Sequence, residues 1–305
     1  MDRNDDRYDL LVVGSANADL VVEVERRPGP GETVSGSDLA VHPGGKGGNQ
    51  AVAAARLGAR TALLARVGDD AHGRLLLDAQ RAAGVSVEAV RTGGAPTGVA
   101  LITVDPSGDN SIVVSPGANA LLTPADVRAA ARLVRAAAVV SAQLEIPVAT
   151  VVETVRVRDG AGRFVLNPSP AGPVPTEVLA ACDPLVVNEH EARVLLGHGA
   201  GDSPGERALA LLALGPRSVV ITLGAAGAVT ADGRTGVVAR IAAVPVTAVD
   251  TTGAGDAFTA ALAWRLGRGD ELPTAAGYAA RVGAAAVTRK GAQESYPTAA
   301  ELPPG

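Results

Sequence analysis

The chain has 305 residues and a net charge of −5, and 47% of its residues are hydrophobic while only 2% are aromatic. This composition is typical of a globular protein with a large core, and because no basic block is present it excludes a nucleic acid as partner. The scarcity of aromatic residues also excludes base stacking as a binding device. No apolar run approaches the roughly 20 residues that cross a bilayer, so we expect no membrane partner.

Cysteine content and the N-terminal residues indicate the compartment. Cys182 is the single cysteine, so an internal disulfide is excluded. Residues 1–9 are charged and polar and do not resemble a signal peptide. We therefore expect a cytoplasmic protein.

The first predicted strand, an apolar run over residues 8–13, ends at Gly14 and is followed by small and polar residues. Ligands bind at the carboxyl ends of strands in open α/β sheets, so Asn17 and Asp19 are candidates for hydrogen bonds to a polyol. The alternative is a turn that these two residues hold with their own side chains. Residues 20–25 alternate apolar and polar groups and predict a half-exposed strand.

A glycine-rich segment, residues 44–49, comes directly before an Ala-rich helical run at 50–57. Glycine permits close approach of the backbone to a ligand, so this loop at a helix N-terminus is a candidate binding element. Lys46 and Asn49 are its candidates for contacts with sugar hydroxyls, although a lone lysine in a glycine loop is more often solvated.

Strands and helices then alternate along the chain. Residues 61–67 predict a strand and 71–83 a helix, and further strands are expected at 138–141, 163–166, 184–187 and 218–222 with helical runs between them. This alternation predicts an α/β fold with a central, mainly parallel sheet flanked by helices. Polar residues follow these late strands, as expected of an active-site rim: Gln143, Glu145, Asn167, residues 188–191 and Thr222.

The domain organisation is predicted to be a single catalytic domain over residues 1–305. Residues 99–104 and 112–115 flank a turn signal at 105–109 and predict a hairpin. This hairpin and the strand at 20–25 are expected to pair away from the main sheet as a discontinuous β lid, from about 15–43 and 98–116. A late hairpin is expected around residues 234–236 and a closing helix over 273–287.

Residues 250–256, with the sequence DTTGAGD, join a predicted strand at 244–249 to a helical run that contains Phe258 and Leu262. The backbone N–H groups of Gly253, Ala254 and Gly255 are expected at the helix N-terminus, which favours an anion such as phosphate. Asp256 beside such a site is placed to accept a proton from an attacking hydroxyl. The alternative is that Asp256 only caps the helix.

Taken together, these motifs resemble the PfkB family of carbohydrate kinases over nearly the whole chain. The matching segments, in order, are residues 14–19 (GSANAD), 30–34 (PGETV), 44–53 (GGKGGNQAVA), 188–191 (NEHE), 250–256 (DTTGAGD) and 288–293 (TRKGAQ). The chain departs from the pattern at Ala280, where some relatives have a histidine near the adenine, and in stopping shortly after Tyr296. These departures imply altered nucleotide affinity or edge stability.

The resemblance implies roles for individual residues. The sugar is expected to contact Asn17, Asp19, Gly45, Lys46, Asn49, Glu145 and Asp256. Asp256 is implied as the base, with Gly253, Ala254 and Gly255 as the anion hole. ATP is expected at Asn188, Thr222, Leu223, Gly224, Ala225, Ala226 and Gly227, and against Gly255 and Asp256. Glu191 is implied to position Mg²⁺ through water, and an activating monovalent cation, K⁺, is expected at Asp250, Thr252, Ala286, Arg289, Gly291 and Ser295.

The activity implied by the resemblance is ATP-dependent phosphorylation of D-ribose at its 5-hydroxyl, by a homodimer that pairs through the β lid. Two alternatives stay open. The first is a kinase of another small sugar or of a nucleoside, which shares the chemistry. The second is a non-catalytic sugar- or nucleotide-binding regulator, against which Asp256 and the intact anion loop argue.

Overall fold

The computed structural model describes residues 7–106, 110–197 and 201–302. Its main sheet has eight strands in the order β14-β13-β12-β11-β10-β9-β1-β4. In chain order these strands are β1 (Leu10–Val13), β4 (Thr61–Leu64), β9 (Val139–Ala142), β10 (Arg163–Leu166), β11 (Leu185–Asn188), β12 (Ser218–Thr222), β13 (Ala228–Asp232) and β14 (Val238–Ile241). The strands from β4 to β12 pair in parallel, while β13 and β14 add an antiparallel edge.

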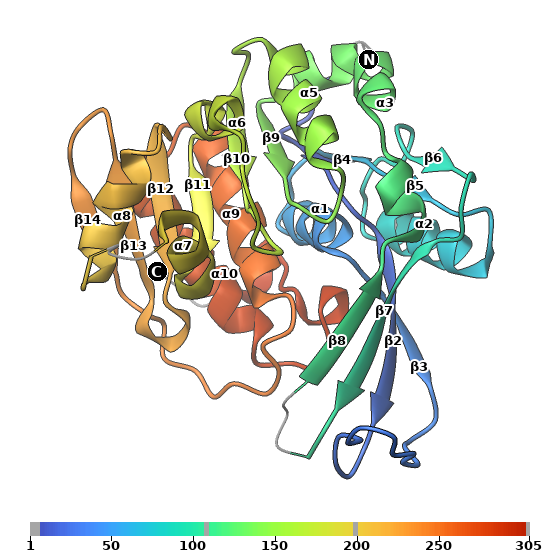
Figure 1. Ribbon diagram of the computed structural model, residues 1–305. Coiled ribbons are helices and arrows are strands. Elements are labelled where there is room, and N and C mark those ends of the chain that lie inside the picture. Colours follow the sequence, from blue (N-terminus) through green and yellow to red (C-terminus); the bar gives the residue numbers. More distant parts are fainter. Residues whose placement is uncertain (1–6, 107–109, 198–200, 303–305) are drawn as a thin grey trace.

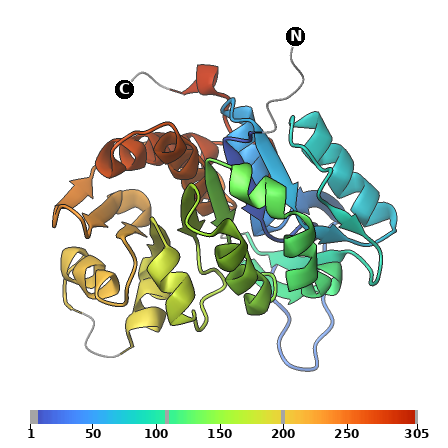
Figure 2. The same ribbon diagram turned by 90° about the horizontal axis from the view of Figure 1, so that it is seen from above.

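Helices cover both faces of this sheet, as Figure 2 shows with the red C-terminal helices on one side and the green to yellow helices on the other. The helices on the first face are α1 (Lys46–Arg56), α9 (Ala254–Gly267) and α10 (Leu272–Ala286). Those on the second are α3 (Pro124–Ala129), α4 (Ala131–Ala136), α5 (Val148–Arg158), α6 (Thr176–Ala181), α7 (Glu189–Leu196) and α8 (Pro204–Leu212). α2 (Ala71–Ala82) packs beside β2 (Asn17–Glu23) and β3 (Ala40–Gly44).

The alternation of side chains along β1 divides the core into these two layers. Leu10 and Val12 belong to the cluster under α1, α9 and α10, whereas Leu11 and Val13 belong to the cluster under the opposite helices. All four are completely buried. A parallel sheet covered on both faces requires such continuous apolar strands, which is why the sequence shows short apolar runs here.

A second sheet projects from the main body, as Figure 1 shows. It has the order β3-β2-β7-β8, formed by β2 (Asn17–Glu23), β3 (Ala40–Gly44), β7 (Gly98–Val104) and β8 (Asn110–Ser115). β7 and β8 pair antiparallel, as the hairpin signal predicts; part of the predicted turn, residues 107–109, lies outside the described residues. All six residues of β8 are exposed.

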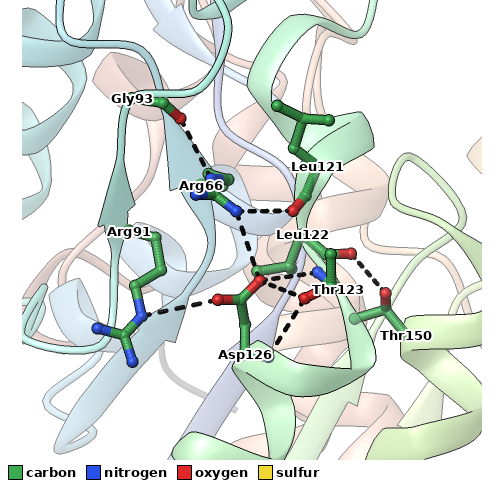
Figure 3. A network of polar contacts seen from close by, with 8 residues as sticks. All are labelled: Arg66, Arg91, Gly93, Leu121, Leu122, Thr123, Asp126 and Thr150. Atoms are coloured by element: carbon green, nitrogen blue, oxygen red, sulfur yellow. Dashed lines mark hydrogen bonds and ion pairs between the residues drawn. The ribbon is translucent and has the colours of Figure 1, made fainter.

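The chain leaves this sheet through η1 (Gly117–Leu121), and a polar network braces that segment (Figure 3). Arg66, on the short strand β5 (Arg66–Val67), donates from Nη1 to the Leu121 carbonyl at 2.9 Å and from Nε to the Gly93 carbonyl at 3.2 Å. Arg66 and Arg91, on β6 (Arg91–Thr92), also pair with Asp126 of α3. The network therefore ties η1 to the main body.

Most expected elements are present, and the predicted α/β fold with a mainly parallel sheet is confirmed. The strand expected at residues 244–249 is wrong, because that segment pairs with no strand. Pro245 lacks a ladder donor, and Val246 and Val249 are 44% and 58% exposed. The strand expected over 61–67 is divided into β4 and β5.

Among the described residues, no helix is long and apolar enough to span a membrane.

Candidate active site

Asp256 lies in the first turn of α9, at the loop that the sequence singles out. Gly253 caps this helix with φ 72°, a left-handed conformation that favours glycine, and an added Cβ would collide with the Tyr296 hydroxyl. That hydroxyl donates to the Gly253 carbonyl at 3.2 Å. An added Cβ on Gly255 would meet nothing within 4 Å. Ala254 N–H donates within the loop to the Thr251 carbonyl at 3.3 Å.

Asp256 is only 6% exposed, and two side-chain amides donate hydrogen bonds to its carboxylate. Asn49 Nδ2 donates to Oδ2 at 3.0 Å, and Gln50 Nε2 donates to Oδ1 at 3.2 Å. Burial raises the pKa of Asp256 above its ordinary value, against the opposing effects of Lys46 and the two amides. A carboxylate with a raised pKa that lines a cavity suits a general base.

Lys46, the first residue of α1, lies among acidic side chains. Burial alone would lower the pKa of its ammonium group, but the carboxylates of Asp256, Glu145, Glu191 and Asp19 together raise that pKa above its ordinary value. Lys46 therefore stays charged. Gly45, before it, has φ 83°, and an added Cβ would lie 2.6 Å from the Asn17 backbone nitrogen, so close packing at this corner also requires glycine.

Asn17, Asp19 and Glu145 complete the polar cluster of residues that are expected to contact the sugar. Glu145 Oε2 accepts from the Ser15 hydroxyl at 2.5 Å and from the Lys46 N–H at 3.0 Å. Burial raises the pKa of Asp19 to about 7, and the charge of Glu145 adds to this. The structure thus brings together residues from β2, α1 and the end of β9, and they present carboxylate and amide groups that suit sugar hydroxyls.

Asp256 also lines a cavity of about 140 Å³. Asn188, Glu191 and Thr222 line it together with Lys46, Gly253, Gly255 and Asp256. Of the predicted nucleotide segment, Thr222 reaches this cavity, and Gly224–Ala226 form η2 immediately after it. Gln143, expected on the rim, is completely buried instead.

Asn188 and Glu191 form a capping box at the N-terminus of α7. The Glu191 N–H donates to Asn188 Oδ1 at 2.8 Å, and the Asn188 N–H donates to Glu191 Oε2 at 2.8 Å. Glu191 is only 5% exposed although it lines the cavity. This acidic side chain is therefore no ordinary solvated residue of a helix start, and its oxygen atoms suit hydrated Mg²⁺.

The residues expected to bind a monovalent cation come from two segments that meet beside the anion loop. Asp250 Oδ1 accepts from the Thr252 N–H and Oδ2 from the Gly291 N–H, both at 2.9 Å. The N–H groups of Val249 and Asp250 donate to the Val287 carbonyl. Ala286, Arg289 and Ser295 lie in the same C-terminal segment. Among the described residues, no three His, Cys, Asp or Glu side chains gather as a metal cluster.

Sequence reasoning missed Asn119, a buried residue of η1. Its Nδ2 donates to Asn17 Oδ1 at 2.7 Å and to the Ala16 carbonyl at 3.2 Å, while its Oδ1 accepts from the Ala16 N–H at 3.0 Å. These bonds hold the root of the projecting sheet and orient the Asn17 amide. The network of Figure 3 in turn braces η1.

Comparison with known proteins identifies the family of this chain. The model of the pfkB family carbohydrate kinases matches residues 7–299. A ribokinase of Bacillus subtilis is 39% identical, over 96% of this chain and 97% of its own, and one of Schizosaccharomyces pombe is 38% identical, over 96% of each chain. The structure of Arabidopsis thaliana ribokinase complexed with ribose and ATP superposes with a TM-score of 0.86 at 34% identity, over 96% of each chain. The chain therefore belongs to the pfkB family of carbohydrate kinases.

Proposed function

We propose that this protein is a ribokinase, which transfers the γ-phosphoryl group of ATP to the 5-hydroxyl of D-ribose and yields D-ribose 5-phosphate and ADP. The observation that carries this proposal is the position of Asp256. Its buried carboxylate is bound by Asn49 of the sugar-side cluster and also lines the cavity that contains Asn188 and Glu191. A general base that lies between the sugar-side residues and this cavity can contact both the sugar and the nucleotide.

The sugar would be held by the sugar-side residues, which are Asn17, Asp19, Gly45, Lys46, Asn49 and Glu145. Asp256 then accepts the proton of the 5-hydroxyl as that oxygen attacks the γ-phosphorus, and the bond between this phosphorus and ADP breaks. The half-buried Lys46 ammonium and the backbone N–H groups at the N-terminus of α9 stabilise the negative charge that develops on the phosphoryl oxygens.

The nucleotide would occupy the cavity and the segment after β12, at Asn188, Thr222, Leu223, Gly224, Ala225, Ala226 and Gly227. Mg²⁺, when bound, neutralises phosphate charge, and the buried carboxylate of Glu191 supports a site reached through water. We assign K⁺ to backbone oxygens near Asp250, Thr252, Ala286, Arg289, Gly291 and Ser295. Residues 250–252 come directly before Gly253, which supports a role for the cation in shaping the loop of residues 253–255.

The projecting sheet is proposed to act as a lid and as the surface through which two copies pair. Asp19 faces the sugar-side cluster from β2, so movement of this sheet would open or close that cluster. Closure would exclude water, which otherwise competes with the sugar for the phosphoryl group. The exposed apolar residues of β7 and β8 support the pairing.

A substrate panel tests the proposal. ADP release would be measured with D-ribose, other pentoses and hexoses, and nucleosides, each with ATP and Mg²⁺, and the product would be identified by mass spectrometry and NMR. We expect D-ribose to give the highest kcat/KM and phosphorylation at the 5-position. A higher kcat/KM with a nucleoside or another sugar would show that this compound, and not D-ribose, is the substrate. Binding of ATP or a sugar without turnover of any compound would favour the non-catalytic alternative.

A further inference from the structure

Gln50 is a polar residue of α1 that directly precedes the small and apolar run of residues 51–55, and it is completely buried. It follows Asn49 in the chain, but no sugar contact is assigned to it. A buried amide needs partners for both its oxygen and its nitrogen, because an unpaired group loses its hydrogen bonds to water without replacement. The partners of Gln50 therefore indicate what the side chain does.

Two donors hold the Gln50 oxygen. Ser141, on β9, donates from its hydroxyl to Gln50 Oε1 at 2.8 Å, and Gln143 Nε2, just beyond the same strand, donates to Oε1 at 2.6 Å. The Gln50 nitrogen then donates to Asp256 Oδ1 at 3.2 Å. A flipped amide would direct its oxygen at the Asp256 carboxylate, which only accepts when ionised, so the carboxylate selects the orientation in which Gln50 Nε2 faces it.

This chain of hydrogen bonds acts on the carboxylate in two ways. Asn49 holds Oδ2 and Gln50 holds Oδ1, so rotation of the Asp256 carboxylate is fixed from both sides. Donors on Oε1 also polarise the Gln50 amide, which strengthens its N–H as a donor to the ionised acid. A donor to the charged form of an acid stabilises that form.

We propose that Gln50 is a positioning residue for the reaction: anchored by Ser141 and Gln143, it fixes the orientation of the Asp256 carboxylate and stabilises its ionised form. This inference rests on the proposed function, in which Asp256 is the base. The hydrogen bonds that run from β9 through Gln50 of α1 to Asp256 of α9 are buried, and they act on the reaction without contacting the sugar or the nucleotide.

The other groups that act on Asp256 would remain in a Gln50 variant. Burial raises the pKa of Asp256, Lys46 lowers it, and Glu145 raises it. Asp19 and Tyr296 are also close enough to interact with it electrostatically. The Gln50 donor is one of the groups that counteract the effect of burial on Asp256. Without it the pKa of Asp256 should rise, and a smaller fraction of the Asp256 carboxyl groups should be ionised at a given pH.

The experiment compares the pH dependence of kcat/KM for D-ribose in wild type, Gln50→Met and Gln143→Met. In Gln50→Met we expect the acidic limb of the pH profile to move to higher pH by about one unit, because one hydrogen bond to the ionised Asp256 carboxylate is lost. Gln143→Met should shift this limb in the same direction but by less, because Gln143 acts on Asp256 only through Gln50. It is the safer variant for folding, because Gln143 Oε1 is buried without a partner among the described residues.

The matched control is Gln80→Met. Gln80 is also a buried glutamine whose Oε1 is unpartnered among the described residues, and its Nε2 donates to the Gly48 carbonyl at 3.3 Å. This variant loses a comparable buried amide but no donor to Asp256, so its acidic limb should coincide with that of wild type. An equal shift in the control, or an unchanged limb in both test variants, would overturn the proposal.

A titration that does not need turnover separates this inference from the proposed function. Aspartate labelled with ¹³C at Cγ would be followed by NMR, with the Asp256 signal assigned by its loss in Asp256→Asn. The midpoint should be higher in Gln50→Met than in wild type. If wild type does not phosphorylate ribose but the midpoint moves, the proposed substrate fails and the role of Gln50 stands; if ribose is phosphorylated and the midpoint is unchanged, the reverse holds.

Discussion

Asp19, on β2, has an unusually high pKa for an aspartate, since burial raises it to about 7 from an ordinary 3.8. The folded state therefore binds a proton here between these pH values, whereas the unfolded chain has released it. Stability from this group is complete below the unfolded pKa and is lost as pH rises through the folded pKa. The free energy of unfolding should accordingly fall as pH rises from about 4 to about 7.

Chemical denaturation at several pH values checks this expectation. Asp19→Asn should remove a large part of the decline, because the amide does not ionise. Asp38→Asn, which changes an exposed aspartate of the projecting sheet region, is the control and should keep the wild-type slope. A slope in Asp19→Asn that equals the wild-type slope would contradict the assignment.

Glu191 has both a helix-capping contact and a place in the cavity, and Glu191→Gln separates the two roles. Glutamine also serves at the third position of a capping box, so α7 should persist. The lost carboxylate should raise the Mg²⁺ concentration needed for half-maximal activity, and excess Mg²⁺ should partly restore turnover. Glu206→Gln makes the same change in the capping box of α8 and should leave the magnesium titration unchanged. Superimposable titrations of Glu191→Gln and wild type would reject the metal role.

Contacts between individual residues could be predicted from the sequence only where the residues lie close together along the chain. Asp256 was predicted because a glycine loop and the helix after it are local features. Gln50 lies 206 residues from Asp256, and Asn119 lies 102 residues from Asn17, the partner that it orients. Only the folded chain brings such pairs together, and one sequence shows no sign of them beyond polar residues within apolar or small-residue segments.

The loop before α9 is the element on which cation dependence should act. Asp250 ties this loop to Gly291, and the Val249 N–H donates to the Val287 carbonyl at 2.7 Å, so the loop and the C-terminal segment would respond together. A K⁺ ion held by their carbonyl oxygens would restrain the N–H groups of residues 253–255 in the orientation that transition-state charge requires.

Potassium should therefore raise kcat or kcat/KM for D-ribose, and sodium, which is smaller and more strongly hydrated, should do less. Initial rates at constant ionic strength with K⁺, Na⁺ or a bulky organic cation measure the effect. Equal rates in the three salts would mean that no such cation acts on this loop.

The elements of the main sheet were largely predictable because buried parallel strands and their helices leave local patterns. Residues 244–249 show where this fails: the segment is β-branched and apolar, but β14 already forms the edge of the sheet and Pro245 cannot donate to another strand. The glycine loop likewise enters α1 earlier than expected, at Lys46, because the close packing of its glycines is a tertiary property.

At the scale of the whole molecule, the outward face of the projecting sheet should mediate a homodimer. The strand registers align Val41, Leu20, Leu101 and Val113 in one row across the sheet. Leu101 and Val113 are 50% and 66% exposed, on the face opposite to that of Asp19. Such a row is apolar surface that pairing would remove from water.

Sedimentation velocity should therefore find a dimer for wild type and a monomer for Val113→Lys, which places a charge in the row. Val237→Lys is the control, because Val237 is also 52% exposed but lies beside β14, away from the projecting sheet. A dimer that survives Val113→Lys and dissociates in Val237→Lys would place the interface elsewhere, and a monomeric wild type would exclude it.

The most direct test of the whole account is the turnover of Asp256→Asn with D-ribose and ATP, measured beside the binding of both ligands by calorimetry. The amide keeps the shape of the side chain but cannot accept the hydroxyl proton, so binding should persist while kcat falls by about 10²- to 10⁴-fold. A correctly folded Asp256→Asn variant with near-wild-type kcat would contradict the account, because the base would then be another group.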